Sequence, residues 1–111
     1  MPIEGGREAG YVVGTGSFSA TGNGQGVQLV RRGDFNVSIW IASGNTFAGT
    51  VVAERSFDGG VTWLPFTYID GSAPSWSAPM STILSEPENG VFWRLRCSVF
   101  TSGTINWRIG Q

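Results

Sequence analysis

The stretch GVFWRLRCSVF, residues 90–100, decides the fold class of this chain. Its side chains alternate with a period of two, which is the pattern of a β-strand with one buried face. We expect one set to face the core: Val91, Trp93, Leu95, Cys97 and Val99. We expect the other set to face outward: Phe92, Arg94, Arg96, Ser98 and Phe100.

The same alternation runs through most of the remaining sequence. It is clear in DFNVSIWI (34–41), GTVVAERSF (49–57) and GTINWRIGQ (103–111). Five shorter runs follow it: YVVGT (11–15), SFSAT (17–21), GVQLVRR (26–32), VTWLPFTYI (61–69) and PMSTIL (79–84). Turn dipeptides such as Asn89-Gly90 separate the runs, and no 3.6-residue period occurs. We therefore predict an all-β protein, an antiparallel β-sandwich or jelly-roll-like fold of about eight or nine short strands.

The length of 111 residues fits one domain. We expect residues 11–111 to form a single β-sandwich domain and residues 1–10 an N-terminal arm. The arm either docks on a neighbouring subunit or adds an end strand to its own sheet. Residues 71–89 hold three prolines and an isolated tryptophan, and we expect a long loop there. Trp76 then either caps the open end of the sandwich or anchors a partner.

Composition excludes several classes of partner. The net charge of −1 and the pI near 5.2 leave no basic surface for nucleic acid. We find no stretch apolar enough for a signal peptide or a membrane span, so we expect no membrane partner. The single cysteine, Cys97, allows no intrachain disulfide and is expected to be a small core residue.

The same counts bear on catalysis. The chain has no His, and all seven of its positive charges are Arg. This removes Ser–His, Cys–His and Ser–Lys nucleophiles, and zinc held by His or Cys. Eight carboxylates remain, but no two of them stand in a setting that marks an acid and base pair. We predict a protein that is not an enzyme and that uses no cofactor and no metal.

The segment SFDGGVTW, residues 56–63, resembles the Asp-box, Ser-x-Asp-x-Gly-x-Thr-Trp, known from sialidases and other β-rich proteins. The specified positions match at Ser56, Asp58, Gly60, Thr62 and Trp63. The resemblance implies a structural hairpin and transfers no sialidase activity. We expect Asp58 to accept backbone hydrogen bonds across the turn, Gly60 to adopt the left-handed conformation, and Trp63 to fold over the hairpin.

A wider resemblance covers more of the chain. Its elements are the segments 35–38 (FNVS), 49–51 (GTV), 54–60 (ERSFDGG), 94–97 (RLRC) and 101–104 (TSGT). In this succession the chain resembles small all-β proteins encoded among the structural genes of tailed bacteriophages. The resemblance implies a virion protein, made in the cytoplasm of the host bacterium. It would act by binding, as a protein that decorates or cements the capsid. Its partners would be the major capsid protein or other virion proteins, and a homo-oligomer, such as a trimer, is expected.

Two other functions stay open. The protein could belong to the tail, the neck or a fibre base of the virion. It could also be a carbohydrate-binding module in which Trp76 or Trp40 stacks on sugar rings. The side chains that we select as candidate interface residues are Trp40, Trp76, Phe92, Arg94, Arg96 and Phe100.

Overall fold

The computed structural model describes residues 13–42 and 46–111; the expected N-terminal arm, residues 1–10, lies outside them. These residues form ten strands and no helix that could cross a membrane. The strands are β1 (Val13–Phe18), β2 (Gly22–Asn23), β3 (Val27–Gln28), β4 (Gly33–Trp40), β5 (Gly49–Ser56), β6 (Leu64–Pro65), β7 (Ser75–Trp76), β8 (Met80–Glu86), β9 (Phe92–Phe100) and β10 (Ile105–Gly110).

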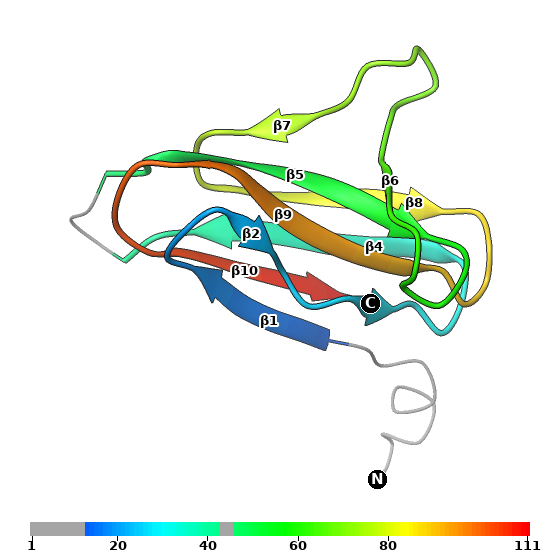
Figure 1. Cartoon of the computed structure of the whole chain (residues 1–111). Helices are drawn as coiled ribbons and strands as arrows, with labels where there is room; N and C mark the ends of the chain where they lie inside the picture. Colours follow the sequence, from blue (N-terminus) through cyan, green and yellow to red (C-terminus); the bar gives the residue numbers. More distant parts are fainter. Residues whose placement is uncertain (1–12, 43–45) are drawn as a thin grey trace, which may run out of the picture.

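The strands lie in two antiparallel sheets that face each other (Figure 1). The first sheet has the order β1-β10-β4-β8. The second has the order β2-β9-β5-β6, in which β3 also pairs with β9 and β7 also pairs with β5. Each long strand is one of the alternating runs of the sequence, because a strand with one face on a core needs an apolar residue at every second position.

Four of the strands are short and form two broken strands. β2 and β3 together make one strand beside β9, and β6 and β7 together make one strand beside β5. When each such pair is counted as one strand, ten strands become eight. One sheet then holds the first, eighth, third and sixth strands, and the other holds the second, seventh, fourth and fifth. This is the strand order of a jelly roll, so the predicted fold class is confirmed.

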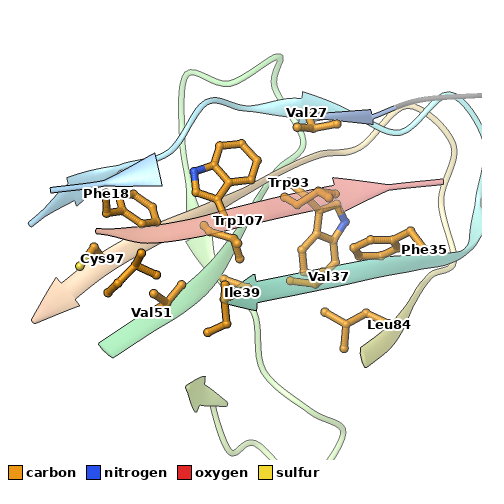
Figure 2. Packing of buried hydrophobic residues seen from close by; sticks show 14 of the residues in the cluster. Phe18, Val27, Phe35, Val37, Ile39, Val51, Leu84, Trp93, Cys97 and Trp107 are labelled. Carbon is orange, nitrogen blue, oxygen red and sulfur yellow. The ribbon is translucent and has the colours of Figure 1, made fainter. Parts of the chain in front are cut away.

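The core fills the space between the sheets (Figure 2). Trp93 of β9 and Trp107 of β10 are its largest fully buried side chains, and the ring of Phe35 lies 4.7 Å from that of Trp93. Each such side chain contributes about 1.5–3 kcal/mol by leaving water. The alternation of the runs 34–41, 90–100 and 103–111 predicts one buried face in each, and the following alternate residues are buried: Phe35, Val37 and Ile39; Val91, Trp93, Leu95 and Cys97; Ile105, Trp107 and Ile109.

The predicted alternation of β9 is wrong at its end. The pairing with β5 runs from Val51↔Cys97 to Thr50↔Val99, so Ser98 is an extra residue that forms a β-bulge. A bulge of one residue exchanges the two faces of the strand beyond it. Val99, expected inside, is therefore exposed, whereas Phe100, expected outside, packs against the core.

Two further expectations are wrong. The run 61–69 was expected to be one strand, but only Leu64–Pro65 is a strand there. The segment 71–89 was expected to be one long loop, but it contains β7 and also β8, which the alternating run 79–84 had indicated. The long loop lies instead between β6 and β7. In Figure 1 it rises away from the two sheets.

Candidate functional site

The hairpin between β5 and β6 has the contacts expected of an Asp-box. The Oδ1 atom of Asp58 accepts hydrogen bonds from the backbone N–H groups of Thr62 (2.8 Å) and Val61 (3.2 Å). The hydroxyl of Ser56 donates to the same oxygen and accepts from the N–H of Gly60. Gly60 has φ of 93°, which only glycine adopts without strain. The turn is thus fixed by its own side chains.

Trp63 closes this hairpin and connects it to the second sheet. Its Nε1 donates to the carbonyl of Gly60 at 3.0 Å, so the indole folds back over the turn. The ring also lies 4.3 Å from the guanidinium carbon of Arg94, which is a cation–π contact. Arg94 in turn donates to the buried Glu54, and Arg96 donates to the other oxygen of the same carboxylate. The outer face of the second sheet therefore holds the hairpin on one side.

A second ion pair holds the hairpin from the other side. Arg55, near the end of β5, donates through Nε and Nη2 to both oxygens of Glu86 in β8, at 2.9 and 2.7 Å. Glu86 is completely buried and also accepts from Nε1 of Trp93. The guanidinium of Arg55 lies 4.7 Å from the centre of the Phe57 ring. This pair joins the two sheets directly beside the Asp-box.

The excursion between β6 and β7 is an insertion in a strand. Phe66 donates its N–H to the carbonyl of Ala53, and Ser75 pairs with the adjacent Val52. The chain thus leaves the edge of β5 and returns to the next position, so residues 67–74 add nothing to the sheet. Loops that leave a scaffold in this way and carry exposed side chains are common binding elements.

The tip of this insertion is ordered by its own hydrogen bonds. Tyr68 donates its N–H to the carbonyl of Ser72, and Gly71 donates to the carbonyl of Tyr68. Asp70 accepts from the hydroxyl and the N–H of Ser72. Tyr68 also packs edge-on against Phe66, with ring centres 5.4 Å apart. Ile69 stands at the tip and is fully exposed.

The hairpin and the insertion expose large apolar side chains between residues 57 and 69. We call these five residues the hairpin–loop surface: Phe57, Val61, Leu64, Tyr68 and Ile69. Phe57 and Leu64, with Asp58 and Thr62, line a shallow depression of about 210 Å³. This volume is below the range of about 300–1,000 Å³ that encloses small ligands. Tyr68 and Ile69 stand separately on the insertion, and exposed apolar residues on ordered elements are typical of a protein interface.

Two carboxylates, Asp58 and Asp70, lie next in sequence to residues of this surface, and the cation of Arg55 lies against Phe57. Hydrogen bonds from the backbone and the side chain of Thr62, and from the side chain of Ser56, lower the pKa of Asp58 to about 2. Hydrogen bonds from the side chain and the backbone of Ser72 likewise lower the pKa of Asp70. Both carboxylates are therefore ionised at neutral pH. They favour a partner that offers positive charge or N–H donors around an apolar area.

Of the candidate interface residues chosen from the sequence, Phe92, Arg94 and Arg96 lie together on one face of β9, and Trp40 lies apart from them on the other sheet. Trp40 is exposed on the outer face of the first sheet. Arg94 and Arg96 lie on the outer face of the second sheet, beside the partly buried Phe92, and both are paired with Glu54. Trp76 and Phe100 are partly buried and pack against the core. For Phe100 the expected outward position is wrong, whereas for Trp76 packing against the sandwich is one of the two roles left open by the sequence.

The hairpin–loop surface was missed because its residues were assigned to other roles. The run 61–69 alternates, which predicts one strand that includes Ile69, whereas in the structure only Leu64 and Pro65 of this run form a strand. The sequence signal that the strand ends before Ile69 is Pro65, which has no N–H to donate to a neighbouring strand, followed by the turn pair Asp70-Gly71. Phe57 and Val61 occupy the unspecified positions of the Asp-box, where the turn itself makes no demand on the side chain.

No protein-family model matches the chain, and no curated protein matches it.

Proposed function

We propose that this protein is a structural component of a bacteriophage virion that decorates or cements the capsid by binding. The observation that carries the proposal is the hairpin–loop surface: exposed apolar side chains on two ordered elements, the Asp-box hairpin and the β6–β7 insertion. The sequence resemblance to phage structural proteins supports the same function. Jelly rolls are also frequent among viral capsid domains, which supports the proposal by analogy.

The way the surface is held favours binding without rearrangement. Phe57 lies against Arg55, and Trp63 lies against Arg94, so ion pairs fix the hairpin on both sides. A preordered surface loses little conformational entropy when it meets a partner. If several copies are joined in an oligomer, simultaneous contacts with a symmetric shell would turn modest single contacts into tight attachment.

The experiment is co-sedimentation of the purified protein with particles that lack it. Ile69→Asp places a charge at the exposed tip of the insertion and should abolish sedimentation with the particles without unfolding the protein. Val99→Asp is the matched control, because Val99 is also an exposed apolar residue, at 53%, but lies on β9. If the wild-type protein stays in the supernatant, or if both variants bind as well as the wild type, the proposal fails.

A second function is favoured by the outer face of the first sheet. Trp40 is 43% exposed there, on a face that also carries polar side chains of β4 and β8 and the charged Arg108 of β10. Asn36 donates to Ser81 at 3.0 Å and accepts from Ser38 at 2.8 Å, so these groups form a linked row. An aromatic ring beside hydrogen-bonding groups suits a sugar ring, and lectin domains also use jelly rolls. A glycan array should then show binding that Trp40→Ala removes, and a blank array rejects this function.

A further inference from the structure

The free edge of β8 is a long unbroken strand edge. β8 pairs with β4 along all seven of its residues without a register shift. Within residues 13–42 and 46–111, it has no strand on its other side. The backbone hydrogen bonds of the described turns and loops involve none of residues 80–86. The outward N–H and C=O groups of β8 are thus available to another strand.

The other edges of the two sheets are shorter or weakened. β6 has two residues and includes Pro65, and β2 and β3 are separated by residues 24–26. β1 has glycine at alternate positions, Gly14 and Gly16, which weakens a strand. β8 contains no proline, no glycine and no bulge. Folded proteins protect exposed edges with such features or with charges, so an edge without them is suited to pairing.

The side chains of β8 indicate the partner. The only charged residue of the strand, Glu86, is buried and bound to Arg55. The side chains on the outer face of the sheet are Ser81, Ile83 and Ser85, and Ile83, at the centre of the strand, is 60% exposed. This edge is therefore neutral, with one apolar side chain at its midpoint, and it is complementary to itself.

We propose that two copies of the chain pair through β8, antiparallel and about a two-fold axis at Ile83. In this register Ile83 faces Ile83 of the second copy, Ser81 faces Ser85, Thr82 faces Leu84, and Met80 faces Glu86. No two charges meet, and the exposed isoleucines cover each other. Two four-stranded sheets become one continuous sheet of eight strands.

The symmetry sets the size of the assembly. A two-fold contact uses the same patch on both copies, so it closes at a dimer. The homotrimer expected from the family resemblance would need a different contact. Edge pairing buries less than the roughly 1,200 Å² of a stable interface, so the dimer is expected to dissociate on dilution. The dimer requires no particle, and it therefore stands or falls separately from the capsid-binding function.

Sedimentation equilibrium of the full chain at increasing concentration tests this interface. The wild-type protein should pass from monomer to dimer. Ile83→Lys places like charges directly opposite each other and should raise the dissociation constant about tenfold or more. Val99→Lys, which adds the same charge at an exposed valine of β9, should leave the dimer unchanged. A mixture of Ile83→Lys and Ile83→Glu should form a heterodimer, because residue 83 of one copy faces residue 83 of the other.

Several results would overturn the proposal. One is a wild-type protein that stays monomeric at every concentration, and another is a trimer. A dimer that Ile83→Lys does not weaken would place the contact elsewhere. If Ile69→Asp dissociates the dimer and Ile83→Lys does not, then the hairpin–loop surface forms the contact between copies. If the Lys and Glu variants fail to pair, the two-fold axis does not pass through residue 83.

Discussion

Replacing Glu86 by alanine should destabilise this protein more than any surface substitution. Glu86 is fully buried and accepts from Arg55 at 2.7 and 2.9 Å, from Trp93 at 3.0 Å and from the N–H of Glu88 at 3.1 Å. Its loss leaves a guanidinium and two N–H groups without their acceptor. Removing one member of a buried ion pair costs about 3–5 kcal/mol.

The lower part of that range applies here. The side chain of Arg55 keeps 23% of its surface exposed, so water can reach it when Glu86 is removed. We therefore expect Glu86→Ala to lower the free energy of unfolding by about 3 kcal/mol. The total for a domain of 111 residues is about 5–15 kcal/mol. At about 4 °C per kcal/mol, the melting temperature should fall by roughly 12 °C.

Urea unfolding, followed by tryptophan fluorescence, measures this loss. Glu88→Ala removes an exposed carboxylate two residues away and should change stability by less than about 0.5 kcal/mol. The double variant Arg55→Met with Glu86→Leu removes both charges and should cost less than Glu86→Ala alone. The reasoning is refuted if Glu86→Ala costs less than about 1 kcal/mol, or if the double variant is less stable than the single one.

Three other predictions concern stability and reactivity. Hydrogen bonds, chiefly from the backbone N–H of Thr62, hold the pKa of Asp58 at about 2. The contribution of this carboxylate to folding stability is therefore complete above its unfolded-state pKa near 4 and is lost as the pH falls toward 2. Asp58→Asn should flatten the dependence of the melting temperature on pH over that window, and equal slopes for the two proteins would contradict this. Gly49→Ala should lower the free energy of unfolding in urea by about 1–3 kcal/mol, because the added Cβ would lie 2.7 Å from the carbonyl oxygen of Val99. An unchanged urea midpoint would show that the bulge is not rigid. Burial raises the pKa of the Cys97 thiol, so a thiol reagent should label it only after unfolding, and rapid labelling of the native protein would disprove its burial.

The alternation of the sequence was enough to predict the sandwich and much of its core, because a strand with one buried face must repeat every two residues. The Asp-box contacts of Asp58 and Trp63 were also predictable, since they depend only on residues close in sequence. The faces of Val99 and Phe100 were not. They depend on an extra residue in β9 that is defined only by its pairing with β5.

The candidate site was harder to predict than the fold. Arg94 and Arg96 were selected because they point outward, which is correct. Both side chains donate to Glu54, which lies 40 and 42 residues earlier in the sequence. A partner at that separation cannot be predicted from a local sequence pattern. Ile69 was assigned to a strand because its run alternates, although the strand ends at Pro65. An alternating pattern shows which residues could lie on a buried face, but it does not show which of them are buried in the folded protein.

Quantitative mass spectrometry of purified phage particles tests the central claim most directly. If the protein decorates the capsid through the hairpin–loop surface, it is present in an amount comparable to the major capsid protein, and particles assembled with the Ile69→Asp variant contain far less of it. A particle without the protein, or one with only a few copies as in a tail, neck or fibre base, contradicts the account.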